Sequence, residues 1–134
     1  SLTIARWSDI WLHEGFACYS EWIWSESSGG PSAHQEATRA HSRLSSLPQD
    51  IVLGDPGPED MFDDRVYKRG ALALHALRRT IGNAAFFDLI REWTTTFRHA
   101  TVATSDFVGL AKQYGSTDEF WESWLEKKRL PRLP

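Results

Sequence analysis

The amino-acid sequence predicts an all-α fold of about six helices around an aromatic core. Apolar residues recur at helical spacing in most segments, clusters of Gly and Pro separate these segments, and no run alternates apolar and polar residues as a half-buried strand does. The chain has 134 residues, of which 41% are hydrophobic, with seven tryptophans and seven phenylalanines. That apolar surface is enough for one core. We therefore expect residues 1–134 to form a single helical domain or subdomain.

The first half of the chain is predicted to contain two helices and a long loop. The first helix covers about residues 8–25 and stops at the Ser, Gly and Pro cluster that follows it. The second helix starts at Pro31 or Ser32 and continues to about residue 46. Residues 47–64, which are rich in Pro, Gly and Asp, should form an ordered loop that connects the two halves of the domain.

Two histidines, His34 and His41, fall on the same side of the second helix. Metal-ligand pairs on a helix usually lie four residues apart, whereas these two lie seven apart. We expect both to be solvated surface residues, and a metal-binding pair is the less favoured alternative.

The second half of the chain is predicted to contain the remaining helices. The longest of them covers residues 65–81 and ends at Gly82. Three helices should follow it. The first should be capped by Asn83, the second by Thr104 or Ser105, and the third should begin with a capping box over residues 116–119. The last helix should end in the basic residues 127–129, because prolines follow it.

Glu14 is the residue of most interest in the first helix. On a helical wheel it shares one face with apolar residues such as Trp11 and Cys18, while Leu12 and Tyr19 gather on the opposite face. A helix that is apolar on two sides is packed on two sides, so Glu14 would be a carboxylate held inside the protein. Buried charges are paired or bind metals. A partner Arg and a bound metal ion are therefore both open from this pattern.

The residues around Glu14 carry a family resemblance. The run from Trp7 to Glu21 reads W-x-D-x-W-L-x-E-G-F-A-x-Y-x-E. It resembles the W-x-D-x-W-L-N-E-G-F-A-x-Y-x-E block of the gluzincin zinc aminopeptidases related to aminopeptidase N and leukotriene hydrolase. The resemblance implies that Glu14 is the third zinc ligand of such an enzyme. Glu21, farther along the same helix, is then a candidate to orient a ligand histidine, and a salt bridge in the core is the alternative for it.

In this family the first two zinc ligands are histidines of an upstream H-E-x-x-H helix, whose Glu is the general base. The present sequence contains no H-E-x-x-H. Its opening residues, Ser1 to Thr3, resemble the S-(L/V)-T that follows this motif in the family, and this register gives the family's spacing between the second His and Glu14. We therefore expect a piece of a larger catalytic domain, resembling the C-terminal helical half of a thermolysin-like domain.

A second block supports the same resemblance. Val66 and Tyr67 precede Gly70 and a Leu-Arg pair, similar to the family's V-Y-x-K-G-x-x-x-L-x-x-L-R. The resemblance implies that Tyr67 donates a hydrogen bond to the oxyanion that forms during peptide hydrolysis, where one preorganised donor is worth about 3 kcal/mol. From its helical position alone, Tyr67 would be a core residue with its hydroxyl at the edge. Gly70 on the same face would let a neighbouring backbone approach closely.

Two positions differ from the family pattern. His13 stands where the family usually has Asn, and Arg69 stands where Lys is common. On the wheel, His13 lies on a polar strip with Asp9 and Ser20, about 100° from Glu14, so we do not expect it to reach the same metal. Arg69 retains the positive charge.

Charge and composition argue against other functional classes. The net charge of -3 does not suggest a nucleic-acid or anionic-membrane partner, and no apolar run approaches the roughly 20 residues that cross a bilayer. Cys18 is the only cysteine, so no internal disulfide is possible. This suits a reducing compartment, and we expect a cytoplasmic location. We interpret Cys18 as a small buried hydrophobe rather than a nucleophile.

The sequence thus predicts part of a zinc-dependent aminopeptidase that removes N-terminal residues from peptides. Its partners would be peptide substrates and the part of the catalytic domain that carries H-E-x-x-H. With one ligand of three and no general base, the 134 residues alone should neither hold zinc tightly nor cleave peptides. The alternative is a non-catalytic helical interaction module derived from a peptidase, whose exposed aromatic residues bind a partner.

Overall fold

The computed structural model describes residues 3–4, 7–60, 62–98 and 100–134, and within them it confirms the all-α fold. The helices are α1 (Ile10–Ser27), α2 (Ala33–Ser45), α3 (Asp64–Ile81), α4 (Asn83–Thr96), α5 (Thr104–Gln113) and α6 (Asp118–Trp121). A 3-10 turn, η1 (Trp7–Asp9), precedes α1, and a π-helical turn, η2 (Glu122–Glu126), continues α6. One feature was not predicted: β1 (Thr3–Ile4) and β2 (Thr101–Val102) pair in parallel.

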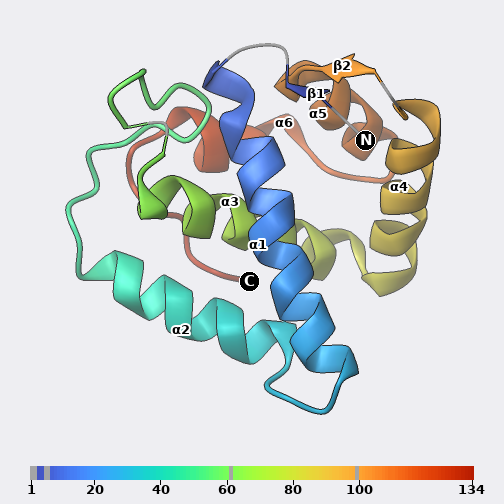
Figure 1. Cartoon of the computed structure of the whole chain (residues 1–134), viewed down its shortest axis with the longest axis horizontal. Helices are drawn as coiled ribbons and strands as arrows, with labels where there is room; N and C mark the ends of the chain where they lie inside the picture. The colour runs from blue at the N-terminus through green and yellow to red at the C-terminus, as the bar shows by residue number, and fades with distance from the viewer. Residues whose placement is uncertain (1–2, 5–6, 61, 99) are drawn as a thin grey trace.

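The long helix α1 crosses over α3, and this pair forms the centre of the molecule (Figure 1). α2 packs against α3 and α1, α4 packs against α3, and α5 packs against α4. The core lies among these helices and is rich in aromatic rings. Its largest fully buried side chains include Trp11, Tyr19, Phe86, Trp93 and Phe107. Because α1 and α3 contact other helices on several sides, they cannot rotate in the fold, and their polar residues keep fixed positions relative to the core.

The described residues of the loop between α2 and α3 contain no helix or strand, and the loop ends one residue before the predicted residue 64, because α3 begins at Asp64. It is nevertheless anchored. Ile51 and Leu53 are buried, and the backbone N–H of Gly54 donates to the carbonyl of Leu125 at 2.8 Å. None of the described helices is both long enough and apolar enough to cross a membrane.

The predicted helix starts were partly right. The second helix was expected to start at Pro31 or Ser32, and Ser32 is its N-cap. Ser32 also forms a full capping box with Gln35, which was not predicted. Asn83 does not cap α4; it lies inside the helix, and its side-chain oxygen accepts from Arg78 Nε at 2.9 Å. A competing side-chain partner therefore removed the cap that local sequence suggested.

Thr104 was also expected to cap a helix, and this was wrong because its hydroxyl serves a distant segment. The Thr104 N–H and Oγ1 donate to Asp9 Oδ1 at 2.8 and 2.6 Å, and Trp11 Nε1 donates to Thr104 Oγ1 at 2.9 Å. Asp9 is consequently buried rather than part of a solvated polar strip. This cluster fixes the start of α1 to the start of α5.

The last helix is shorter than predicted. Thr117 caps it, and η2 ends at Glu126 rather than at residues 127–129. The reason lies in Arg69, whose buried guanidinium donates to the carbonyls of Trp124 and Lys127, at 3.0 and 2.6 Å, and to others in the tail. Burial lowers the pKa of Arg69 to about 10, which still leaves a cation at neutral pH. The charge of Arg69 therefore holds the chain after η2.

The two histidines of α2 are not solvated surface residues, contrary to the prediction. His34 Nδ1 lies 3.0 Å from His75 Nε2 of α3, and His41 Nε2 lies 2.7 Å from the carbonyl of Pro131. His75 is itself buried, and its Nδ1 lies 2.8 Å from the hydroxyl of Tyr19. Both α2 histidines thus make tertiary contacts that a single helix cannot reveal.

Lowering the pH from 7.5 to 5 is expected to reduce the free energy of unfolding by about 2 kcal/mol through His75. Burial and the nearby His34, Arg78 and Arg79 lower the pKa of His75 to about 4, from the ordinary 6.5. Between these two values the unfolded state binds a proton that the native state does not, so stability falls as the pH falls. Urea unfolding at both pH values measures the change. In His75→Phe the free energy of unfolding should depend less on pH, whereas the control His13→Gln, at an exposed position, should keep the dependence of the wild type. Equal pH dependence in both variants would show that His75 is not its source.

Candidate functional site

The candidate site lies where α1 crosses α3 (Figure 1). Gly15 and Gly70 meet at this crossing. A Cβ on Gly15 would lie 2.9 Å from the carbonyl carbon of Gly70, and a Cβ on Gly70 would lie 2.9 Å from the carbonyl oxygen of Trp11. Real Cβ atoms do not approach so closely, so the two helices touch backbone to backbone. The close approach predicted at Gly70 is confirmed.

Substituting Gly70→Ala is expected to reduce the free energy of unfolding by about 1–3 kcal/mol. The added methyl group meets backbone atoms of α1, which cannot move aside as a side chain can. The matched control is Gly109→Ala in α5, where a Cβ has nothing within 4 Å. There the change should stabilise the protein by about 0.5–1 kcal/mol, because Ala favours helix. Urea unfolding of both variants tests this, and equal effects would contradict the backbone contact.

The glycine contact brings Glu14 and Tyr67 together. Glu14 directly precedes Gly15 in α1, and Tyr67 lies one helical turn before Gly70 in α3. Both side chains are half-buried. Their proximity has an electrostatic effect: burial, the carboxylate of Glu14 and that of Asp64 raise the pKa of Tyr67 above its ordinary value of 10. The phenol of Tyr67 therefore stays protonated at neutral pH and remains a hydrogen-bond donor.

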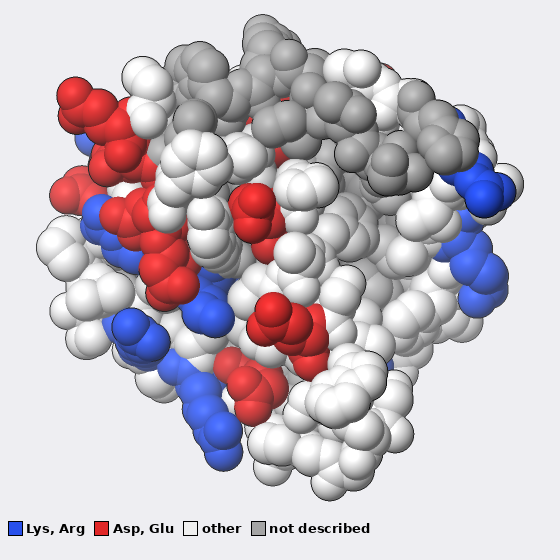
Figure 2. All heavy atoms as spheres, viewed as in Figure 1, with Lys and Arg blue, Asp and Glu red and all other residues white. Residues whose placement is uncertain are grey.

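Glu14 is less enclosed than the wheel suggested. α1 buries apolar residues on two sides, including Trp11 and Leu12, but Glu14 is only half-buried and Ala17 is exposed. No described cation forms an ion pair with Glu14, so the alternative of a buried Arg partner finds no support among the described residues. In Figure 2, the acidic side chains on the molecular face along which α1 runs are surrounded mainly by uncharged residues.

Two neighbours on α1 are solvent-exposed. His13 is exposed, in agreement with its predicted place on the polar strip. Glu21, two helical turns after Glu14, is exposed as well and forms no ion pair with a described residue, so it is not part of a salt bridge in the described core. Its carboxylate is thus available for a partner outside the described residues.

Cys18 is buried between α1 and α3, as expected for a small hydrophobe. Burial raises the pKa of the Cys18 thiol, although the Lys68 ammonium, whose Nζ lies 3.7 Å from Sγ, acts in the opposite direction. A raised thiol pKa disfavours the thiolate, which agrees with the interpretation of Cys18 as a small buried hydrophobe.

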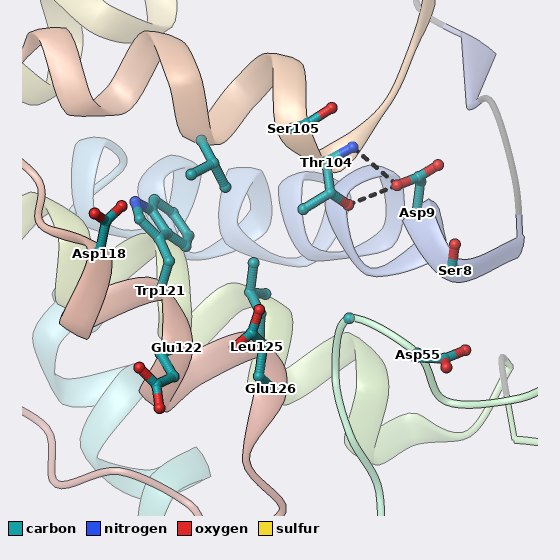
Figure 3. A pocket seen from close by; sticks show the side chains of 12 residues that line it. Ser8, Asp9, Asp55, Thr104, Ser105, Asp118, Trp121, Glu122, Leu125 and Glu126 are labelled. Atoms are coloured by element: carbon teal, nitrogen blue, oxygen red, sulfur yellow. Dashed lines mark hydrogen bonds between the residues drawn. The ribbon is translucent and has the colours of Figure 1, made fainter.

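A hollow of about 800 Å³ lies elsewhere, between η1, α5 and α6 (Figure 3). Its lining includes Asp9, Asp55, Trp121 and Glu122, but neither Glu14 nor Tyr67. The Asp9 carboxylate points toward Thr104 and is engaged by it, as the dashed lines show. Neither member of the Glu14–Tyr67 pair therefore lines this hollow.

The site offers one ligand for a metal ion, the carboxylate of Glu14. Among the described residues, no group of three or more His, Cys, Asp or Glu side chains is placed to hold a metal ion. Glu14 is nonetheless a carboxylate on a rigid helix, without a competing cation among the described residues. Carboxylate oxygen is a regular zinc ligand beside histidine nitrogen. The residues present therefore fit a zinc ion whose other ligands come from outside this chain.

A family model described as the peptidase family M1 domain matches residues 1–124. Leucine aminopeptidase 2 of Saccharomyces cerevisiae is 29% identical across 99% of this chain, which corresponds to 23% of that protein. The chain spans about a quarter of the length of the curated relatives it matches.

Two solved structures are also similar. A two-domain M1 zinc metallopeptidase bound to L-tryptophan is 39% identical with a TM-score of 0.89, over 99% of this chain and 31% of that one. An M1 zinc metallopeptidase from Deinococcus radiodurans is 39% identical with a TM-score of 0.87, over 98% of this chain and 30% of that one. Since the family model covers nearly the whole sequence and the helices superpose on M1 structures, the chain belongs to peptidase family M1.

Proposed function

We propose that the whole protein is a zinc-dependent aminopeptidase, and that this chain supplies its third zinc ligand, Glu14, and its oxyanion donor, Tyr67. The observation that carries the proposal is the placement of Glu14 beside Tyr67, next to the Gly15–Gly70 contact. Membership of family M1 supports it, and so do similar proteins named as leucine aminopeptidase and zinc metallopeptidase.

Each group has a distinct chemical task. Zinc, when bound, supplies Lewis acidity that polarises a peptide carbonyl and activates water. Glu14 holds the metal through a carboxylate oxygen, and two histidines from the rest of the protein complete the set. Tyr67 keeps its proton at neutral pH and donates a hydrogen bond to the oxyanion that develops on the substrate.

Glu21 has a supporting part in this proposal. Ligand histidines regularly donate their second N–H to a carboxylate, which fixes the ring orientation and the tautomer. Glu21 lies on the same helix as Glu14, is exposed and is free of ion pairs with described residues. It can therefore accept such a hydrogen bond from a histidine outside this chain.

The full-length protein should bind one zinc ion per molecule and release N-terminal residues from peptides. Metal analysis and mass spectrometry of digested peptides measure both. The 134-residue chain alone, with one ligand, should show neither tight zinc binding nor cleavage, and it serves as the control. A full-length protein without zinc and without release would overturn the proposal.

That negative result would favour a non-catalytic interaction module. The observation on its side is the exposure of two large aromatic side chains, Trp24 at 72% and Phe62 at 62%. Exposed aromatic residues are typical of binding surfaces. In that case Trp24→Ser and Phe62→Ser would abolish partner binding, whereas Glu14→Ala would not.

A further inference from the structure

A smaller hollow, of about 180 Å³, lies where α1, α2 and α3 meet. Three basic residues line it, Arg39 and Arg43 of α2 and Lys68 of α3, together with Glu36 and Trp22. We refer to this feature as the α2 basic hollow. Figure 2 shows basic side chains gathered over α2 and beside it, at the lower left of the molecule.

The α2 basic hollow has three cations and one carboxylate, Glu36, in its lining. Arg39 pairs with Glu36 at 3.4 Å, but its side chain is 72% exposed, so the pair is weak. No described carboxylate forms an ion pair with Arg43 or Lys68. Within the described part of the chain, the Nζ of Lys68 donates to Cys18 Sγ, a poor acceptor, at 3.7 Å. Such a group of cations is suited to bind an anion.

The α2 basic hollow is linked to the Glu14–Tyr67 site through α1 and α3, the helices that carry both. Lys68 directly follows Tyr67 in α3, and its contact Cys18 lies one turn after Glu14 in α1. Cys18 and Trp22 follow Glu14 at axial rises of about 6 and 12 Å. An extended peptide covers such a distance with roughly two to four residues.

We propose that the α2 basic hollow binds a carboxylate of the peptide substrate, roughly two to four residues from the scissile bond. The inference rests on the proposed aminopeptidase function and narrows its substrate class. The carboxylate belongs to the C-terminus of a short peptide or to an acidic side chain, since both offer the same pair of oxygens. The guanidinium of Arg43 can engage both oxygens, and the ammonium of Lys68 adds a point charge.

The test measures binding apart from turnover. Zinc-loaded full-length protein carrying Tyr67→Phe is titrated calorimetrically with three tetrapeptides: Leu-Ala-Ala-Ala with a free carboxylate, its C-terminal amide, and the amide with Glu at the third position. We expect a carboxylate-bearing peptide to bind about tenfold more tightly than the plain amide. Adding Arg43→Gln and Lys68→Met should remove this preference. The control is Arg91→Gln in α4, an exposed arginine that pairs with Asp88 and should preserve it.

Each outcome has a defined meaning. Tighter binding of the free-acid peptide supports the proposal with the C-terminus as the source, and tighter binding of the Glu-containing amide supports it with a side chain as the source. Equal affinity for all three peptides, no binding of any, or a preference that survives the Arg43 and Lys68 substitutions overturns it. Failure of the wild-type protein to release N-terminal residues would count against the aminopeptidase proposal alone, because the titration does not depend on hydrolysis.

Discussion

Full-length protein carrying Glu14→Ala is expected to lose both its zinc and its peptidase activity. The free energy of zinc binding at structural sites is about 10–16 kcal/mol. If three protein ligands contribute equally, each contributes about 3–5 kcal/mol, which corresponds to roughly a thousandfold in affinity. Among the described residues, no group of three or more His, Cys, Asp or Glu side chains is placed to hold the metal in its absence. Competition with a zinc chelator measures the affinity, and metal analysis after dialysis gives the content.

The matched control is Glu119→Ala. Glu119 is an exposed carboxylate in the first turn of α6, without an ion pair to a described residue, so its loss should leave the zinc content unchanged. Circular dichroism should show that both variants keep their helices. Stoichiometric zinc in Glu14→Ala would remove this residue from the ligand set and with it the central part of the proposed mechanism.

Tyr67→Phe is expected to reduce turnover by about a hundredfold or more while zinc stays bound. The substitution removes one hydroxyl and keeps the ring, so packing against α1 is preserved. A single preorganised oxyanion donor is worth about 3 kcal/mol in the transition state, and it contributes little to binding of the ground state. The effect should therefore fall on kcat rather than on KM. Steady-state kinetics with an aminoacyl arylamide, together with metal analysis, separates the two.

Tyr114→Phe provides the comparison. The Tyr114 hydroxyl donates to Glu92 at 2.6 Å, far from the α1–α3 crossing, so its removal should change turnover little. The pair of variants differs only in where the hydroxyl is lost. If Tyr67→Phe and Tyr114→Phe turned over peptides equally well, Tyr67 would have no part in the chemistry.

The helices, and the places of Glu14 and Tyr67 on them, could be predicted because that information is local. Each residue lies in a short run whose spacing fixes its place on a helix face, and Gly70 in a helix interior signals close approach because glycine is otherwise unfavourable there. The family resemblance added the chemical roles, which periodicity cannot supply.

Contacts between distant segments could not be predicted. The Arg69 guanidinium donates to the carbonyl of Trp124, which lies 55 residues away in the sequence. Asp9 accepts a hydrogen bond from Thr104 across 95 residues, and the rings of His34 and His75 contact each other across 41 residues. In each case a polar side chain has several local interpretations, and only tertiary packing selects the partner. The capping errors at Asn83 and Thr104 have the same origin.

The contact between Gly15 and Gly70 makes the α1–α3 separation independent of side-chain size. The two helices are held apart by main-chain atoms, which every substitution elsewhere leaves unchanged. Substitutions in the surrounding core can change side-chain volume and shift the outer helices. The backbone contact next to Glu14 and Tyr67 stays the same. Core substitutions away from Gly15 and Gly70 are therefore expected to leave the α1–α3 spacing beside Glu14 and Tyr67 unchanged.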